Sequence, residues 1–224
     1  MFVITGSTRG IGKFLFNEFQ NSAIGLYNNT KPETSESDKY YCVDVTNVEQ
    51  ILSWRDQNIS NLKDIVLVNC AGINYSSFAS KADIKKWHEV IDINLKGTFN
   101  MINALLPIMK EQKFGRIINL SSVVGQIPVI GTSAYAASKS ALTGMIKSIA
   151  VENAIHGITI NNLNLGYFDI GMISEIPKNI QEMIKEKIPC KEFGNPINIK
   201  NAIDFIVNSN YVNGTSIELS GGLI

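Results

Sequence analysis

Short apolar segments alternate with longer stretches of helical pattern along this chain of 224 residues. The segments that we expect to be strands are 1–5, 23–27, 39–43, 64–69, 115–121, 158–164 and 215–219. A crossover between parallel strands takes about a dozen residues or more and usually contains a helix, so this alternation predicts a parallel sheet covered by helices on both faces. We therefore expect a doubly wound α/β fold in one domain, residues 1–224. The exception is the polar connection 28–38, which predicts a loop because it has no apolar stripe to pack on a sheet.

A glycine turn follows the first predicted strand, in the sequence Thr5-Gly6-Ser7-Thr8-Arg9-Gly10-Ile11-Gly12. Glycine allows the backbone to approach a pyrophosphate closely, and the N-terminus of the following helix offers N–H groups and a positive dipole end. The spacing G-x-x-x-G-x-G differs from the general dinucleotide fingerprint G-x-G-x-x-G, so a plain tight turn is the alternative.

A phenol and an ammonium group stand four residues apart in Tyr135-Ala136-Ala137-Ser138-Lys139 and share one face of a predicted helix. A neighbouring lysine favours the phenolate, so we expect it to lower the pKa of Tyr135 from its usual value near ~10 and make it a useful acid and base. Ser122, thirteen residues before Tyr135, ends an apolar strand that can deliver its hydroxyl to the same place. A lone Y-x-x-x-K pattern also occurs by chance on solvent-facing helices.

Together these motifs resemble those of the short-chain dehydrogenases/reductases, over essentially the whole chain. Asn69-Cys70-Ala71-Gly72 is similar to the family's N-N-A-G strand end, and Asn94 matches its helix asparagine. The resemblance implies a Rossmann-type, seven-stranded sheet in the order 3-2-1-4-5-6-7 and a substrate lid at about 166–190. It implies the catalytic residues Asn94, Ser122, Tyr135 and Lys139. By the family's spacing the catalytic hydroxyl is Ser122, because the neighbouring Ser121 faces the other side of a strand.

The resemblance also implies a nicotinamide cofactor and assigns residues to its binding. These are Gly6, Ser7, Thr8, Arg9, Gly10, Ile11, Gly12, Asn28, Asp44, Val45, Asn69, Ala71, Gly72, Tyr135, Lys139, Gly166 and Phe168. Asn94 would hold a water that connects Lys139 to solvent, although a helix-kink residue bonded to backbone is an equally compatible interpretation. Asp44 would meet the adenine, or else cap the helix that begins near Asn47.

The choice of cofactor is predicted from the end of the second strand. NAD enzymes usually place an acidic residue there, whereas this chain has Asn28 and Asn29. Arg9 can direct a guanidinium at a 2′-phosphate, which favours NADP (as NADPH) over NAD, unless Arg9 pairs with a surface carboxylate.

The sequence departs from the family after the sixth strand, where Leu165 replaces a proline and Ile170 replaces a threonine that bonds the nicotinamide carboxamide. Since Ile170 has no side-chain donor, the carboxamide must rely on another residue or on backbone groups, for which an N–H at 168 or 170 would suffice.

The expected substrate is a small carbonyl compound, free or bound to a carrier, and the pattern most resembles 3-oxoacyl thioester reductases. Enzymes of sugars, polyols or other small ketones, and a nicotinamide-binding redox sensor without turnover, are the alternatives. Candidate pocket residues are Tyr75, Phe78, Val124, Gln126, Ile127, Tyr167 and Phe168.

Composition excludes other classes of partner. A net charge of +0 gives no electrostatic reason for binding nucleic acid or an anionic membrane. Three cysteines and two histidines, widely spaced, predict no metal site and suggest buried thiols in a reducing cytoplasm. No apolar run is long enough for a membrane span, and the first predicted strand starts at Met1 without a signal peptide before it. By resemblance we expect a homotetramer, or a homodimer, that pairs through helices at about 83–111 and 133–156.

Overall fold

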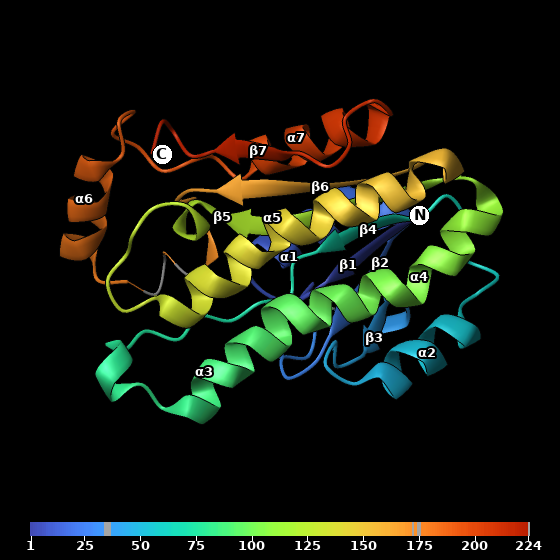
Figure 1. The fold of residues 1–224 in the computed structure, drawn as a ribbon, viewed down its shortest axis with the longest axis horizontal. Coiled ribbons are helices and arrows are strands. Elements are labelled where there is room, and N and C mark those ends of the chain that lie inside the picture. Colours follow the sequence, from blue (N-terminus) through green and yellow to red (C-terminus); the bar gives the residue numbers. More distant parts are fainter. Residues whose placement is uncertain (34–36, 172, 174–175, 224) are drawn as a thin grey trace.

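A computed structural model describes residues 1–33, 37–171, 173 and 176–223 of the chain. Seven strands form one sheet in the order β3-β2-β1-β4-β5-β6-β7 (Figure 1), and every neighbouring pair is parallel. The predicted doubly wound sheet is therefore confirmed, including its strand order.

The strands lie close to the predicted segments. They are β1 (Phe2–Thr5), β2 (Ala23–Tyr27), β3 (Tyr40–Cys42), β4 (Val66–Asn69), β5 (Gly115–Ser122), β6 (Ile158–Leu165) and β7 (Ser216–Leu219). The largest difference is at β4, which begins two residues later than the predicted 64–69. Asp64 adopts a positive φ of 47°, a left-handed conformation that ordinary strand residues do not take, so extended pairing starts only after it.

The helices are α1 (Gly10–Phe19), α2 (Val48–Gln57), α3 (Ile84–Ile91), α4 (Thr98–Gln112), α5 (Ser133–Asn153), α6 (Lys178–Lys187) and α7 (Ile197–Asn208). A π-helix, η4 (Asp92–Gly97), joins α3 to α4. In Figure 1 helices α4 and α5 cross in front of the sheet, and α6 lies beyond the end to which the arrows of β6 and β7 point.

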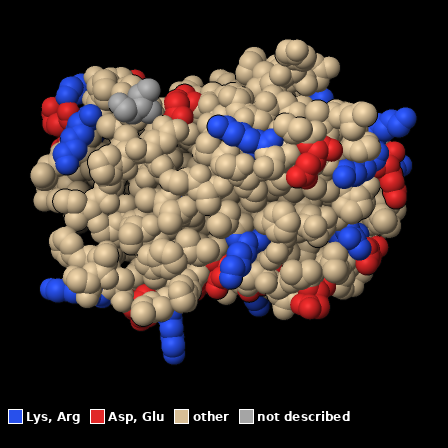
Figure 2. All heavy atoms as spheres, viewed as in Figure 1, with Lys and Arg blue, Asp and Glu red and all other residues tan. Residues whose placement is uncertain are grey.

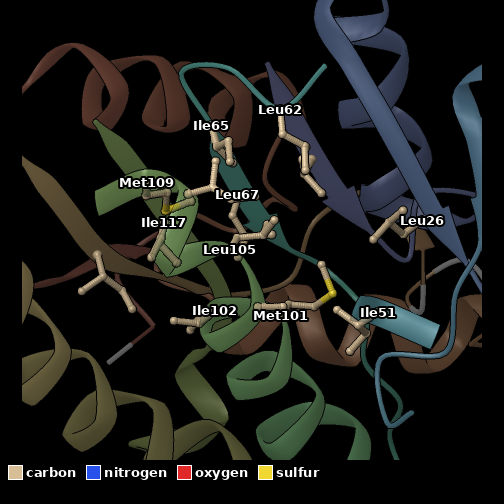
Figure 3. Packing of buried hydrophobic residues seen from close by; sticks show 14 of the residues in the cluster. Leu26, Ile51, Leu62, Ile65, Leu67, Met101, Ile102, Leu105, Met109 and Ile117 are labelled. Carbon is tan, nitrogen blue, oxygen red and sulfur yellow. The ribbon is translucent and has the colours of Figure 1, made fainter. Parts of the chain in front are cut away.

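Two hydrophobic clusters hold the helices to the two faces of the sheet. One cluster joins α2, α4 and α5 to the strands. In Figure 3 Leu105 and Met109 of α4 lie beside Leu67 and Ile117, and Met101 lies beside Ile51 of α2. The other joins α1 and α7 to the opposite face. Leu67 and Leu105 are each 0% exposed, and full burial of such a side chain stabilises the fold by roughly 1.5–3 kcal/mol.

A ladder of buried asparagines crosses three neighbouring strands, β4, β5 and β6. Asn69 of β4 donates to Asn119 of β5 at 2.9 Å, and Asn119 donates to Asn162 of β6 at 3.1 Å. Because buried amides that lose their partners are costly, the ladder fixes the register of the strand ends on which the candidate site is built.

Three further expectations concern surface features. The described part of the connection between β2 and β3 contains only a short 3₁₀ turn at Ser37–Lys39, as the polar sequence predicted, and 34–36 lie outside the described residues. The prediction that all three cysteines are buried is wrong, because Cys42 lies exposed on the edge strand β3 and Cys190 is exposed in a loop. None of the described helices is long and apolar enough to cross a membrane.

Candidate active site

The glycine turn between β1 and α1 packs against the loop that follows β4. Thr5 ends β1, and its hydroxyl oxygen accepts hydrogen bonds from the N–H groups of Cys70 and Ala71, at 3.0 and 2.9 Å. A Cβ atom on Gly6 would lie 2.9 Å from the Cα of Ala71, and Gly6 has a φ of +65°. Both the close approach and the backbone conformation therefore require glycine.

The rest of the turn leads into the N-terminus of α1. Gly10 has a φ of +49°, and Gly12 has no room for a Cβ because the carbonyl of Gly6 and the Cys70 sulfur already fill that space. Ser7 is buried and donates its hydroxyl to the Leu26 carbonyl at 3.1 Å, so its side chain holds the turn to β2. Arg9, at the N-cap position of the ten-residue helix α1, makes no side-chain capping bond to a described residue, so the first N–H groups of the helix are suited to binding an anion.

Arg9 precedes α1 and is exposed. No carboxylate among the described residues forms an ion pair with Arg9, whereas Lys13 pairs with Glu33 at 2.6 Å. The alternative that a surface carboxylate engages Arg9 is thus not seen within residues 1–33, 37–171, 173 and 176–223.

Asn28 and Asp44 lie at one end of a hollow of about 1070 Å³, which is lined mostly by residues of α3, η4, α4 and α5. The carboxylate of Asp44 accepts from the N–H and the hydroxyl of Thr46, both at 2.8 Å. Asn47, not Asp44, caps α2 by accepting from the Gln50 N–H at 3.0 Å. The capping role considered for Asp44 is therefore wrong. Val45, next in the chain, is buried, and its carbonyl accepts from Asn100 at 3.0 Å.

Ser122 and Tyr135 meet at the carboxyl end of β5. Ser122 is the last residue of β5, Tyr135 lies in the first turn of α5, and their side chains are hydrogen-bonded. The Ser122 oxygen also accepts from the Val124 N–H at 3.2 Å. Ser121 points elsewhere and donates to the Lys139 carbonyl at 3.3 Å. The geometry thus places the hydroxyl of Ser122, rather than that of Ser121, beside the phenol.

Lys139 lies one turn after Tyr135, with its Nζ 5.6 Å from the centroid of the tyrosine ring. The expectation that it lowers the pKa of Tyr135 is not met. Burial raises the pKa of Tyr135 to about 12, and the hydrogen bond from Ser122 opposes this only in part. Burial also lowers the pKa of Lys139 to about 8, and its ammonium group donates to the Leu120 carbonyl at 2.7 Å. Desolvation therefore dominates the electrostatics of this pair.

Asn94 is fully buried in the π-helix η4 and braces the site. Its side chain accepts from the Ile73 N–H and donates to the Ile73 carbonyl, both at 2.9 Å, and donates to the Ser138 hydroxyl at 3.1 Å. A Cβ on Gly72 would lie 3.3 Å from the Asn94 side-chain oxygen and 3.8 Å from the Lys139 Nζ. Asn94, Gly72 and Lys139 are thus brought together, and the bonds of Asn94 are those of the helix-kink interpretation.

The segment after β6 is held by backbone hydrogen bonds. The Gly166 N–H donates to the Leu219 carbonyl at 2.9 Å, and a Cβ on Gly166 would lie 2.9 Å from the Cα of Ser220. The Ile170 N–H already donates to the Phe168 carbonyl at 2.7 Å. The Phe168 side chain is buried in the core, so only its backbone can face a ligand.

Two of the seven predicted pocket residues are held by hydrogen bonds within the protein, and a third is exposed. Tyr75 and Gln126 form hydrogen bonds within the chain. The Tyr75 oxygen accepts from the Asp83 N–H at 2.9 Å, and Gln126 donates to the Glu218 carboxylate at 2.9 Å. Phe78 is 64% exposed. In the predicted lid, α6 carries the exposed Met183, whereas Met172 lies outside the described residues.

Four residues at the site were missed by sequence analysis. Thr5 joins the two loops, Ser138 holds Asn94, and Glu218 accepts from both Gln126 and Asn164, at 2.9 and 2.7 Å. Cys70 lies close enough to Lys139 for the ammonium charge to oppose the rise that burial produces in its pKa, which still reaches about 12. None of these partners is adjacent in sequence, so no local spacing could have revealed them.

The arrangement can hold a nucleotide and protonate an oxygen. The glycine turn and the N-terminus of α1 have the close backbone approach and the N–H groups that binding a pyrophosphate requires. Ser122 and Tyr135 provide two neighbouring hydroxyl groups, which can bind a carbonyl oxygen by hydrogen bonds and transfer a proton to it.

Comparison with known proteins agrees with this geometry. Residues 1–181 match the model of the family described as short chain dehydrogenase. The 3-oxoacyl-[acyl-carrier-protein] reductase FabG of Staphylococcus aureus is 33% identical over 238 aligned positions, which cover 99% of this chain and 96% of that protein.

Two solved structures share the fold closely. The 3-oxoacyl-[acyl-carrier protein] reductase of Brucella melitensis has a TM-score of 0.89 and 27% identity, covering 99% of this chain and 90% of that one. The aldohexose dehydrogenase of Thermoplasma acidophilum has a TM-score of 0.90 and 26% identity, covering 99% and 92%.

Proposed function

Because the chain belongs to the short-chain dehydrogenase family, whose members act on CH–OH and C=O groups, we propose that it is an NADPH-dependent reductase of 3-oxoacyl thioesters. The observation that carries the proposal is the hydrogen-bonded pair of Ser122 and Tyr135 at the end of β5, in a chain that aligns almost end to end with a 3-oxoacyl reductase.

In this proposal Tyr135 acts as the acid. NADPH, when bound, would supply the hydride that reduces the carbonyl carbon. Ser122 donates a hydrogen bond to the carbonyl oxygen, and Tyr135 transfers its phenolic proton to that oxygen as negative charge develops there. With its pKa raised by burial to about 12, the phenol of Tyr135 is protonated at neutral pH, and it gives up its proton because the developing alkoxide is a stronger base than the phenolate.

Lys139 and Asn94 support the acid. Lys139 lies one helical turn from Tyr135 and would bind the ribose hydroxyls of the nicotinamide half. Asn94 would hold a water through which Lys139 returns a proton to Tyr135 from solvent. Its bonds to Ile73 keep the π-helix in place beside Gly72 and Lys139.

The cofactor is held, in this proposal, by the glycine turn Gly6–Gly12, by Asn28, Asp44 and Val45, and by the backbone of Asn69–Gly72. The exposed Arg9 and the absence of an acidic residue at the end of β2 favour a 2′-phosphate, hence NADPH rather than NADH. Gly166 and the Phe168 N–H would face the nicotinamide, since the Ile170 N–H is engaged within the chain.

We further infer self-association through α4 and α5. Phe99 of α4 and Val151 of α5 are 46% and 83% exposed, and a Cβ on Gly144 would meet nothing within 4 Å. Figure 2 shows this face of the molecule, where charges of both signs are interspersed and large areas carry none. A tetramer, or a dimer, and a cytoplasmic location stay predictions.

A sugar or polyol dehydrogenase is the second candidate, because the aldohexose dehydrogenase shares the fold at a TM-score of 0.90. It would use the same four residues with oxidised cofactor and an alcohol. A nicotinamide sensor without turnover is disfavoured by the paired Ser122 and Tyr135.

The deciding experiment measures the loss of reduced-nicotinamide absorbance with an acetoacetyl thioester, using NADPH or NADH. We expect turnover with NADPH in the wild type and its loss in Tyr135→Phe, with Tyr211→Phe, a change at a fully exposed tyrosine, as the matched control. Oxidation of an aldohexose with NADP or NAD, without reduction of the thioester, would favour the second candidate. NADPH binding with neither reaction would favour the sensor.

A further inference from the structure

Tyr167 is brought to the candidate site by the pairing of β5 with β6. The register of these strands sets Ser122 opposite Leu165, so Tyr167 follows only two residues beyond the partner of the proposed catalytic serine. Its backbone is held from the other side, because the Gly194 N–H donates to the Tyr167 carbonyl at 2.9 Å.

The direction of the Tyr167 side chain follows from its neighbour. Phe168 pairs with Gly194 as an isolated bridge, and its ring is buried in the cluster that α1 and α7 cover. Successive side chains of an extended segment point to opposite sides. Tyr167 therefore points away from that cluster, toward the face of the sheet on which α5 carries Tyr135.

Electrostatics agree that the two phenols are near each other. A charge on Tyr167 raises the pKa of Tyr135, and burial raises the pKa of Tyr167 itself. Because its pKa is raised, the Tyr167 hydroxyl is protonated at neutral pH. Because the residue is only half-buried, the hydroxyl remains accessible to a ligand. The site thus contains a second phenolic donor that the proposed proton transfer does not use.

We propose that Tyr167 is a substrate-binding residue whose hydroxyl donates a hydrogen bond to the thioester carbonyl of the substrate. This inference rests on the proposed function. A 3-oxoacyl thioester carries two carbonyl oxygens in a 1,3-relationship, so a substrate whose keto oxygen lies at Ser122 and Tyr135 presents its second oxygen a few atoms away. Ser122 and Tyr135 would donate to the keto oxygen, and Tyr167 would donate to the thioester oxygen. A compound with a single ketone has no second oxygen for Tyr167 to bind.

The test compares wild type, Tyr167→Phe and the control Tyr211→Phe with NADPH. With an acetoacetyl thioester we expect Tyr167→Phe to raise KM about 3- to 10-fold and to change kcat less than about twofold, because one neutral hydrogen bond to bound substrate is lost. The butyryl thioester keeps the thioester carbonyl and lacks the ketone. Its competitive inhibition constant should rise by the same factor as the KM.

A methyl ketone of similar length, which lacks the thioester, is the discriminating ligand. Its inhibition constant should be the same in Tyr167→Phe and wild type. An unchanged KM for the acetoacetyl thioester, or an equal weakening of the thioesters and the ketone, would overturn the role of Tyr167. If the wild type reduces no 3-oxoacyl thioester, the proposed function itself fails, which is a distinct result.

Discussion

The buried side-chain amide of Asn94 accepts a hydrogen bond from the Ile73 N–H and donates one to the Ile73 carbonyl, both at 2.9 Å. The amide thus pairs with the backbone of Ile73 in the way that a residue of a neighbouring strand would. The pair joins the π-helix η4 to the loop that leaves β4. Because Gly72 precedes Ile73 and lies beside Lys139, the same two bonds set the distance between the proposed cofactor loop and the proposed proton pathway.

Replacing Asn94 with alanine should therefore destabilise the fold and lower activity. The Ile73 N–H and carbonyl and the Ser138 hydroxyl would lose a buried partner, so we expect the free energy of unfolding to fall by roughly 2–4 kcal/mol. Urea unfolding measures this, with the exposed Asn29→Ala as control. A loss below ~0.5 kcal/mol in Asn94→Ala would show that the bonds do not brace the site.

Ile170 offers a test of how the nicotinamide is positioned. The change Ile170→Thr adds the hydroxyl that the resemblance to the family predicts at this position, and Ile170→Val is the matched control with the shape of threonine and no hydroxyl. We expect the dissociation constant of NADPH to be about 3- to 10-fold lower in the threonine variant than in the valine variant, the worth of one hydrogen bond. Fluorescence titration with NADPH measures it. Equal affinities would mean that backbone groups already satisfy the carboxamide.

Arg9 should decide between the two cofactors. Its guanidinium is exposed before α1, where a 2′-phosphate would lie, and a hydrogen bond between charged groups contributes about 1.5–3 kcal/mol. We expect Arg9→Ala to raise KM for NADPH roughly 10- to 100-fold and KM for NADH less than about threefold. Arg55→Ala, which removes a guanidinium paired with Asp56 in α2, is the control. A parallel rise for both cofactors would contradict a phosphate-specific role.

Sequence was a good guide where the signal is local. Apolar runs predicted all seven strands, and the four-residue spacing of Tyr135 and Lys139 placed both on α5. The sequence was a poor guide to properties that depend on how deeply a side chain is buried. The pKa of Tyr135 rises because the phenol is buried, which spacing does not reveal, and Cys42 is exposed because β3 is an edge strand.

Long-range partners were equally hidden from the sequence. Thr5 bonds the N–H of Ala71, 66 residues away, and Glu218 meets Asn164 across 54 residues. Such pairs form because parallel strands bring their carboxyl ends to one edge, so their positions follow from strand order and register rather than from any motif.

Glu218 should hold the loop that follows Ser122. One of its oxygens accepts from both Gln126 and Asn164, so Glu218→Ala should free Gln126. We expect the backbone amides of Gln126 and Ile127, both bonded to the Val123 carbonyl, to exchange hydrogen at least about 10-fold faster. Glu218→Gln is the matched control, since its amide oxygen can still accept. Faster exchange in both variants would point to general destabilisation instead.

Lys139 should make stability rise with pH above neutrality. Burial lowers its pKa from 10.5 to about 8, so between these values the unfolded chain binds a proton that the folded chain has released. The contribution of Lys139 to stability therefore increases as pH rises from about 8 toward 10.5, by on the order of 3 kcal/mol for the full shift.

The variant Lys139→Met tests this, because methionine is of similar length and has no charge to desolvate. At pH 7 it should be more stable than the wild type to urea, and the difference should shrink as the pH is raised to 9.5, where the wild-type lysine has become neutral in the folded state. Tyr135, with its pKa raised to about 12, affects stability only above its unfolded value near 10. Cys70, whose pKa burial raises from 9.0 to about 12, lowers the stability of both proteins as the pH rises above 9, so the test rests on the difference between wild type and variant. A stability difference that stays constant from pH 7 to 9.5 would mean that Lys139 keeps its charge in the folded protein.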